Sequence, residues 1–512
     1  MHTRLTTLAV VAACSALTSV AHAASGEEIV STLCGACHEQ TATGWDRIDS
    51  VRKTPEGWDM TVRRMIHNFH IGGVSDDEIA AVVAYLSDTQ GLSVAETQGR
   101  RYILEREPVA SDQGPTEQMT QTCGRCHSYA RVELQRRTPE DWAKLVHFHL
   151  GQFPTLEYQA LARDRDWWGL AQSEIIPWLA EHYPLGQAPA PYAGDPAGDY
   201  IVAGHQPGRG DYRGTMTVTG PREGMEVTMA LTYADGAQAE YTGRAHILGA
   251  GEWRGTLGGA DGDIHQVLAV GPDGRLDGRW FLAAQDVTGG RISAVRADHP
   301  PVVLAAQPAM LRIGQPAEIR ISGTGLSDQV TAPEGVTVDS VTQDAGGVTL
   351  TLAAAEPGPI TLDIAGQPVA LVAYERLDRI SIIPDVAMSR IGGGGGAIPK
   401  TPAQFQAMGW LNGPDGQPGT DDDVAVGIVP AAWSIAPWSG EAARMQDDKY
   451  AGVIDQTGLF TPADAGPNPE RPMMTNNVGD LRVIATVEQD PPLTAEAHLY
   501  ATVQRFVDAP IR

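Results

Sequence analysis

The pattern of apolar and polar residues divides the chain into a helical N-terminal region and a longer region of short strands. In the segment SDDEIAAVVAYLSD, which begins at Ser75, apolar residues recur every three or four positions behind a polar and acidic start. This pattern predicts an amphipathic helix. The segment QSEIIPWLAEHY, from Gln172, has similar apolar spacing and predicts another helix. From residue 199 onward apolar and polar residues alternate, which is typical of strands.

The helical region contains an internal repeat. The segment RKTPEGW at 52–58 returns as RRTPEDW at 136–142, and the pattern F-H-x-G occurs at both 69–72 and 148–151. Thr before Pro and Glu supplies an N-cap, a first helical residue and an acidic first turn, so each copy is predicted to begin a helix at T-P-E. We interpret residues 24–190 as two tandem modules, at about 24–107 and 108–190.

The strand-rich remainder is predicted to form three domains. The Pro, Ala and Gly-rich segment 186–198 is interpreted as a linker, and Asp-Gly pairs at 235, 261, 273 and 277 predict hairpin turns. We expect a β-barrel or sandwich at 191–299 and immunoglobulin-like sandwiches at 300–375 and 376–512. In the last of these, a Trp followed by D-x-x-G-x-F-T-P resembles bacterial immunoglobulin-like domains. The predicted fold class is multidomain α plus β, with an all-α N-terminal domain followed by three antiparallel β domains.

The first 23 residues, MHTRLTTLAVVAACSALTSVAHA, have the features of a secretory signal peptide. A short basic start precedes an apolar run that ends in Ala-His-Ala, a cleavage signal. We expect export to the periplasm and a mature chain that begins at Ala24. A lipoprotein signal acylated at Cys14 is the alternative, but the apolar run continues past that cysteine. No later segment approaches the about 18 to 20 apolar residues of a membrane span.

The charge of the chain excludes one class of partner. Its formal net charge is -26 and its isoelectric point is near 4.8. Nucleic acids bind basic surfaces, because their phosphates must be neutralised. We therefore expect no nucleic-acid partner.

The cysteines carry the most specific chemistry. Beyond Cys14 the chain has four, Cys34 and Cys37 followed by His38, and Cys123 and Cys126 followed by His127. C-x-x-C-H is the attachment motif of haem c, in which two thiols bond to the haem vinyl groups and the histidine binds iron. Zinc knuckles would leave both histidines unexplained, and a thioredoxin-like site needs a single pair in a βαβ unit. Disulfides are the remaining alternative in an oxidising compartment. We predict two covalently bound haems.

The second axial ligand of each haem is expected in the segment before the last helix of each module. The repeated F-H-x-G pattern favours His70 in the first module and His149 in the second. Met65 and His67 compete in the first module, and His147 competes in the second. The second module has no methionine between its C-x-x-C-H motif and its final helix, so histidine is the natural ligand there.

Two other motifs do not support a catalytic site. The segment IGGGGGAIPK at 391–400 lacks the Lys-Ser/Thr ending of a phosphate-binding loop, so we interpret it as a flexible or partner-contacting loop. The segment DGQPGTDDD at 415–423 could bind calcium, but its carboxylates do not follow the EF-hand spacing. No Ser/His/Asp set or nucleophile elbow is evident in the β regions.

Tandem C-x-x-C-H modules followed by three β domains resemble the large, α subunit of quinohaemoprotein amine dehydrogenase. The resemblance implies a periplasmic heterotrimer, with a β-propeller subunit and a small subunit that bears a cysteine tryptophylquinone. In that family the quinone oxidises primary amines to aldehyde and ammonia. The dihaem chain then passes the electrons to an external cytochrome c or blue copper protein. By this resemblance the chain has no catalytic residues of its own.

Two other functions are consistent with the motifs. A dihaem peroxidase-like enzyme would need one haem with an open or exchangeable sixth ligand. A non-catalytic relay protein would use its immunoglobulin-like domains only to dock a partner.

Overall fold

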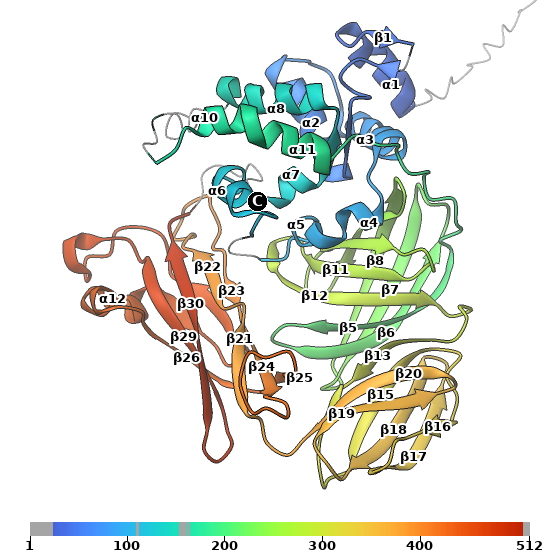
Figure 1. Ribbon diagram of the computed structural model, residues 1–512, viewed down its shortest axis with the longest axis vertical. Coiled ribbons are helices and arrows are strands. Elements are labelled where there is room, and N and C mark those ends of the chain that lie inside the picture. The colour runs from blue at the N-terminus through green and yellow to red at the C-terminus, as the bar shows by residue number, and fades with distance from the viewer. Residues whose placement is uncertain (1–23, 43, 109–111, 153–160, 162–163, 505–512) are drawn as a thin grey trace, which may run out of the picture.

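The computed structural model describes residues 24–42, 44–108, 112–152, 161 and 164–504. Four regions follow one another along the chain (Figure 1): a helical region, a β-barrel, a β-sandwich and a C-terminal β region. The predicted signal peptide and Cys14 lie outside the described residues. Within them, no helix is both long enough and apolar enough to cross a membrane.

The helical region follows the capping signals of the sequence. Thr54 accepts a hydrogen bond from the Gly57 N–H at the start of α2, and Ser75 forms a capping box with Glu78 at the start of α3. Both predicted helix starts are confirmed. The first module holds α1 (Gly26–Thr32), η1 (Cys34–Ala36), α2 (Pro55–Asn68), α3 (Asp76–Gln90), α4 (Val94–Thr97), η2 (Gln98–Arg100) and α5 (Arg101–Leu104).

The second module repeats this plan with one irregular final helix. Its elements are α6 (Glu117–Thr122), α7 (Ala130–Glu133), α8 (Pro139–Gln152), α10 (Trp167–Leu170), η3 (Ala171–Ile175) and α11 (Ile176–His182). The predicted helix from Gln172 is confirmed, although η3 is a π-helical turn directly before Pro177. Because proline cannot donate the usual backbone hydrogen bond, a local irregularity is expected there.

Two short ladders also belong to the helical region. Strand β1 (Gln40–Thr41) pairs with β2 (Gly44–Trp45), and β3 (Val51–Lys53) pairs with β4 (Gln135–Arg137). The multidomain α plus β prediction is confirmed, whereas an all-α N-terminal domain is not. The second ladder joins the two modules directly.

The barrel is closed by eight antiparallel strands, with β12 returning to β5. Its interior is filled by apolar side chains, including the fully buried Trp253, Trp280 and Tyr212. The strands are β5 (Gly198–Gln206), β6 (Gly210–Thr219), β7 (Met225–Tyr233), β8 (Gln238–Leu248), β9 (Glu252–Gly259), β10 (Ile264–Val270), β11 (Leu276–Leu282) and β12 (Gln285–Arg296).

Three of the four predicted Asp-Gly turns lie between barrel strands, and the fourth prediction is wrong. Asp277 and Gly278 lie inside β11, paired with Ala269 and Leu268 of β10. A Cβ atom on Gly278 would lie 2.2 Å from the Val267 carbonyl oxygen, so this glycine permits close strand contact instead of a turn.

The sandwich packs two four-stranded sheets face to face, β13-β15-β18-β17 and β14-β20-β19-β16. Alternating residues of both sheets, such as Ile319, Leu350 and Leu362, form its core. The strands are β13 (Val302–Gln307), β14 (Met310–Arg312), β15 (Ala317–Thr324), β16 (Val330–Thr331), β17 (Val336–Asp344), β18 (Gly347–Ala354), β19 (Gly358–Ile364) and β20 (Gln367–Tyr374).

The C-terminal β region contains a four-stranded sheet, β22-β30-β29-β26, and two three-stranded sheets, β21-β24-β25 and β23-β28-β27. Its elements are β21 (Arg379–Ile383), β22 (Val386–Arg390), β23 (Ala403–Gln404), β24 (Gln406–Leu411), β25 (Val424–Val429), β26 (Ala432–Pro437), α12 (Gly440–Met445), α13 (Asp447–Tyr450), β27 (Gly452–Ile454), β28 (Leu459–Pro462), η4 (Pro472–Met474), β29 (Gly479–Val487) and β30 (Leu493–Thr502).

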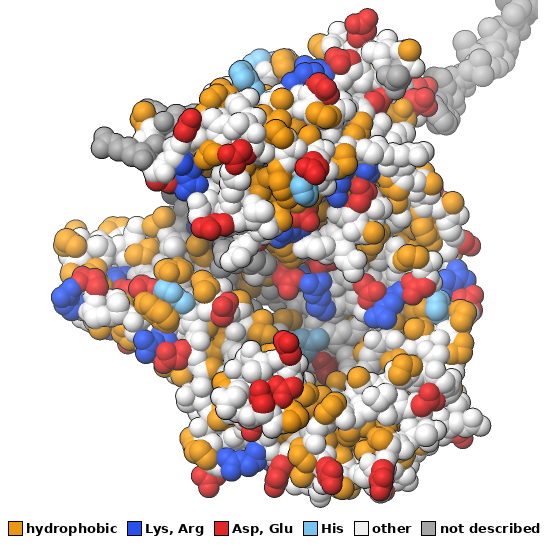
Figure 2. Space-filling view, in the orientation of Figure 1, with side chains coloured by type: hydrophobic (Ala, Val, Ile, Leu, Met, Phe, Trp, Pro, Cys, Tyr) orange, Lys and Arg blue, Asp and Glu red, His pale blue; other side chains and the backbone are white. Residues whose placement is uncertain are grey.

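The helical region lies against the outer side of the barrel (Figure 1), over β9 to β12, where ion pairs and apolar contacts join the two. The Arg101 guanidinium donates to both oxygens of Glu252, at 2.7 and 3.1 Å. Arg254, beside Glu252 on the barrel, reaches across to Glu56 of α2 at 2.6 Å. Figure 2 shows a hollow where the helical region, the barrel and the C-terminal β region meet.

Candidate haem-binding sites

Both C-x-x-C-H segments follow the end of a short helix. Helix α1 ends just before the first motif, and Cys123 is the C-cap residue of α6 in the second. Nδ1 of His38 lies 2.9 Å from the Asp46 carbonyl oxygen, and Nδ1 of His127 lies 2.8 Å from that of Ser128. A hydrogen bond at Nδ1 fixes the ring and leaves Nε2 to bind a metal, as iron-ligating histidines require.

The second motif opens into a cavity of about 610 Å³. Cys123, Cys126, His127 and the predicted distal ligand His149 all line it. The remaining wall is formed partly by α7, α8 and the final helical segment and partly by residues 53–64, Val83 and residues 103–106 of the first module. Its apolar lining includes Val132, Leu134, Trp142, Leu145, Val146, Phe148, Trp167, Ala171, Ile175 and Leu179.

The two histidines of this cavity are suited to bind iron as neutral imidazoles. His149 lies in α8, with Nδ1 2.8 Å from the Leu145 carbonyl oxygen. Burial lowers the pKa of His127 and, as the largest cause, that of His149. Both therefore favour the unprotonated form, which can donate a nitrogen lone pair. Burial also raises the pKa of the Cys123 thiol to about 12, consistent with its apolar surroundings.

The competing histidine of the second module lies elsewhere. His147 is exposed, and its ring contacts Trp168 edge to face, with the centroids 6.0 Å apart. It is not among the residues that line the cavity. The structure thus brings together Cys123, Cys126, His127 and His149, but not His147.

The F-H-x-G pattern occupies different places in the two modules. Phe148 and His149 lie inside α8, whereas Phe69 is the C-cap of α2 and His70 lies beyond it with a φ of 52°. Phe69 is 68% exposed, and His70 is exposed as well. The shared F-H-x-G pattern therefore does not give His70 the structural position that His149 has.

Aligning the two helices from their first residues gives a different pair of equivalent residues. Helices α2 and α8 both have 14 residues and begin at the proline of T-P-E. Counted from Pro55 and Pro139, residue 11 is Met65 in α2 and His149 in α8. Met65 is half-buried, whereas His67 is exposed. Sequence reasoning could have found this by aligning the helices from their shared T-P-E start.

Positive charge gathers at the cavity of the second module. Its lining includes Lys53 and Arg64 from the first module and Arg131 and Arg137 from the second. Nε of Arg64 and Nε1 of Trp167 are buried, and no hydrogen-bond partner is found for either in the described part of the chain. Orphaned donors and cations in an apolar cavity fit a haem, which combines an apolar ring with carboxylates. No sequence motif indicated that Arg64 lines this cavity.

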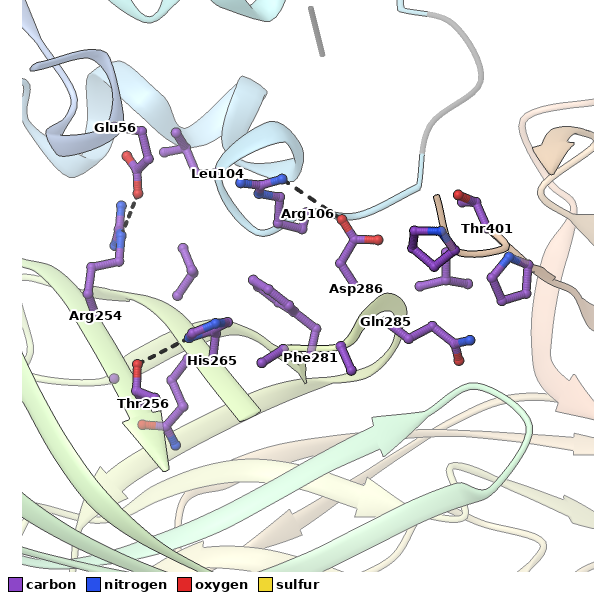
Figure 3. Close-up of a pocket in the computed structure, with 18 of the residues that line it drawn as sticks. Glu56, Leu104, Arg106, Arg254, Thr256, His265, Phe281, Gln285, Asp286 and Thr401 are labelled. Atoms are coloured by element: carbon purple, nitrogen blue, oxygen red, sulfur yellow. Dashed lines mark hydrogen bonds and ion pairs between the residues drawn. The ribbon is translucent and has the colours of Figure 1, made fainter. Parts of the chain in front are cut away.

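A second cavity, of about 720 Å³, lies where the helical region, the barrel and the C-terminal β region meet; we call it the cleft (Figure 3). Glu56, Leu104 and Arg106 line both the cleft and the cavity of the second module, so the two are neighbours. The cleft is rich in cations for a chain of net charge -26. They are Arg106, Arg244, Arg254, Arg390 and Lys400, against the carboxylates Glu56 and Asp286.

The glycine-rich segment ends at the cleft. Ile398, Pro399 and Lys400 line it, and Lys400 forms an ion pair with Asp464 at 2.7 Å. Carboxylates of the acidic segment 415–423 are bound by protein groups: Asp423 pairs with Arg379 of β21 at 2.5 Å, and Asp422 accepts a hydrogen bond from Thr420 at 2.6 Å. Among the described residues, no group of three or more His, Cys, Asp or Glu side chains is arranged to hold a metal ion.

Comparison with solved structures gives little information on function. A de novo designed fluorescence-activating β-barrel is 22% identical, with 20% of this chain and 91% of that chain covered and a TM-score of 0.17. Mouse Cadherin-23 EC22-24 is 12% identical, with 48% and 79% covered and a TM-score of 0.16. Protocadherin gammaB7 EC3-6 is 12% identical, with 55% and 69% covered and a TM-score of 0.18. A search of curated proteins found no match.

Family models cover nearly all of the chain after its first 23 residues. Residues 24–189 match the haem-binding part of the quinohemoprotein amine dehydrogenase alpha subunit. Residues 195–297, 300–375 and 380–511 match domains II, III and IV of the same subunit. The four models follow one another in order, as the four structural regions do. The chain therefore belongs to the family of quinohemoprotein amine dehydrogenase alpha subunits, and it is the haem-carrying subunit of an oxidoreductase.

Proposed function

We propose that this chain is the dihaem electron-transfer subunit of a periplasmic amine dehydrogenase. It would receive electrons from a cysteine tryptophylquinone on a small partner subunit during oxidation of primary amines to aldehyde and ammonia. An external cytochrome c or blue copper protein would be the acceptor, and a β-propeller subunit would complete the heterotrimer. The observation that carries this proposal is the second-module cavity, which contains a complete C-x-x-C-H motif and a second histidine.

In the second module, Cys123 and Cys126 would hold the haem covalently, and His127 and His149 would bind its iron. When bound, haem c supplies reversible one-electron chemistry at the iron. The protein contributes fixed, neutral imidazoles and an apolar wall that excludes water. With His127 and His149 both bound to the iron, the site would favour electron transfer over peroxide chemistry, which needs an open position.

In the first module, Cys34 and Cys37 would hold the haem and His38 would be the first axial ligand. Our sequence prediction for the second ligand is His70, with Met65 and His67 as alternatives. The helix correspondence supports Met65, since it has the position in α2 that His149 has in α8. Histidine-methionine ligation generally gives a higher potential than bis-histidine ligation, so the two sites would differ in potential.

We propose that the quinone-bearing subunit docks at the cleft. The cleft lies next to the second-module cavity and shares Glu56, Leu104 and Arg106 with it. Leu104 and Phe281 are buried in the apolar contact between the helical region and the barrel, next to the cleft. Cations outnumber carboxylates in the lining of the cleft, and Arg244 is exposed there, which favours an acidic partner surface although the chain as a whole is acidic. Helix α1 of the first module lies at the edge of the helical region away from the C-terminal β region (Figure 1), and we propose that this edge faces the external acceptor.

The proposal is tested by adding a primary amine, without oxygen, to the purified complex and to the isolated chain. We expect the haem absorption bands of the complex to change to those of the ferrous form, while the isolated chain stays ferric until dithionite is added. A complex that dithionite reduces but no primary amine reduces would contradict the proposal. Reduction of the isolated chain by amine alone would contradict it as well.

A further inference from the structure

The cations at the second-module cavity come from both modules. Lys53, Arg64 and Arg106 belong to the first module, and Arg131 and Arg137 to the second. Arg106 pairs with Asp286 of the barrel at 3.9 Å, and we call the other four cations the cluster. Lys53 is 6% exposed and Arg137 also 6%, so two of the four are nearly removed from water. Buried cations are unfavourable unless an anion compensates them.

The carboxylates of the cavity wall are already engaged by other cations. Glu56 pairs with Arg254 of the barrel at 2.6 Å, and Asp59 pairs with the exposed Arg63 at 2.9 Å. Arg137 pairs with Asp141, whereas Lys53 and Arg64 form no ion pair with any carboxylate among the described residues. The wall therefore has more buried positive charge than its own carboxylates compensate.

Arg64 is the least satisfied member of the cluster. Its Nε is buried without a hydrogen-bond partner among the described residues, and its guanidinium lies 5.2 Å from the centre of the Phe148 ring. Burial lowers the pKa of Arg64 and also that of Lys53, which is further lowered by the charges of Arg137 and Arg64. Lys53 donates to the neutral Thr61 hydroxyl at 2.6 Å, and the charge of Asp141 offsets only part of the lowering of its pKa.

Equivalent positions of the internal repeat carry different residues at this contact. Arg64 and Phe148 are both residue 10 of their helices, and they contact each other across the module boundary. The second-module cavity thus receives the cation Arg64 from the first module. The corresponding residue of the second module, Phe148, is apolar.

We propose that Lys53 and Arg64 of the first module, with Arg131 and Arg137, clamp the propionate carboxylates of the haem bound to the second module. This inference rests on the proposed haem of that module. The clamp neutralises the carboxylates in the apolar cavity and adds positive potential near the iron. It therefore raises the midpoint potential of this haem above the value that its ligands alone would give, and it makes that potential depend on contact between the modules.

The test is spectroelectrochemical titration of the full chain with Arg64→Gln, a change that removes the charge and keeps much of the side-chain volume. We expect one midpoint potential to fall, with reduction about tenfold less favourable, or about 59 mV for a one-electron couple. The other potential should not move. Arg64→Lys should restore most of the difference. The matched control is Arg63→Gln, since Arg63 is exposed on the same helix and pairs with Asp59 and Asp76.

Two further variants keep the test decisive. Lys53→Met should lower the same potential, and it reports independently if Arg64→Gln fails to fold. In a chain that also carries Cys123→Ala and Cys126→Ala, Arg64→Gln should no longer shift any potential. Unchanged potentials in both charge variants at full haem content, or equal shifts of both haems, would overturn the clamp. A wild-type chain without haem in the second module would instead overturn the proposed function.

Discussion

Arg52 and Arg136 pair directly across the β3-β4 ladder, although they are the same position of the internal repeat. The two modules therefore meet about a local two-fold axis that passes between these arginines. Both reach the same carboxylate: Glu96 lies 2.8 Å from Arg52 and 3.3 Å from Arg136. A single acidic residue of the first module thus holds the junction between the two predicted haem sites.

Replacing Glu96 with Gln should loosen this junction. The side chain of Glu96 is 25% exposed and that of Arg52 is 4% exposed, so the change leaves a buried guanidinium without its counter-charge. We expect the helical region to lose about 2 to 3 kcal/mol of stability at neutral pH. Thermal unfolding of the holo chain followed by haem absorption measures the loss. Glu181→Gln, an exposed change on α11, is the control and should have no effect.

The effect of Glu96 should also depend on pH. Burial alone would raise its pKa, but hydrogen bonds from Arg52 and from the Ser93 backbone outweigh burial and lower the pKa below the usual 4.5. A carboxylate with a lowered pKa stabilises the fold fully above its unfolded pKa and progressively less as the pH falls through the folded value. The difference between wild type and Glu96→Gln should therefore shrink below about pH 4.5. A difference that grows in acid would contradict this role.

Single substitutions in the full chain can identify which candidate residue is the second axial ligand of each haem. His149→Ala should convert one ferric haem from low spin to high spin, because it removes an iron ligand. Met65→Ala should do the same to the other haem, and His70→Ala should change neither. Electron paramagnetic resonance of the ferric chain distinguishes these outcomes. A high-spin signal from His70→Ala with none from Met65→Ala would instead assign His70 as the ligand.

Glu252 should be essential for attaching the helical region to the barrel. Its side chain is 3% exposed and pairs with Arg101 and Arg254. Glu252→Gln removes the buried carboxylate that both guanidinium groups share and leaves Arg101 with Glu105 and Arg254 with Glu56. The loss should cost about 3 kcal/mol. The variant should unfold at a lower temperature and be cut by protease between the two regions. Glu240→Gln, an exposed change on β8, should behave as wild type.

The proposed docking site predicts a charge effect on association. Arg244 is exposed and lines the cleft. Arg244→Glu should slow association with the quinone-bearing subunit about tenfold at low salt, and salt should reduce the difference. Stopped-flow mixing measures the rate. Arg312→Glu, an equal change on an exposed arginine of the sandwich, is the control. Equal rates for the two variants would place the partner elsewhere.

The sequence carries local information well. Thr54 and Ser75 mark helix starts because capping depends on neighbouring residues, and three Asp-Gly pairs mark hairpins for the same reason. Both C-x-x-C-H motifs were identifiable because haem attachment fixes their spacing. What the sequence did not reveal depends on contacts between distant segments. Arg64 reaches a cavity of the other module, and closure of β12 onto β5 decides between barrel and sandwich.

Similar sequence motifs can also lie in different backbone conformations. Gly278 permits close strand pairing where its Asp-Gly pair suggested a turn, and His70 follows a helix that His149 lies within. A motif match therefore needs a shared structural reference, such as the proline that begins both α2 and α8.

Haem stoichiometry tests the central claim most directly. The number of haems per chain, measured by haemochrome absorption and intact mass on the exported protein, should be two. It should fall to one when Cys34 and Cys37 are both changed to Ala, and to one when Cys123 and Cys126 are both changed. A wild-type chain with free or mutually bridged cysteine sulfurs and no haem would contradict the account.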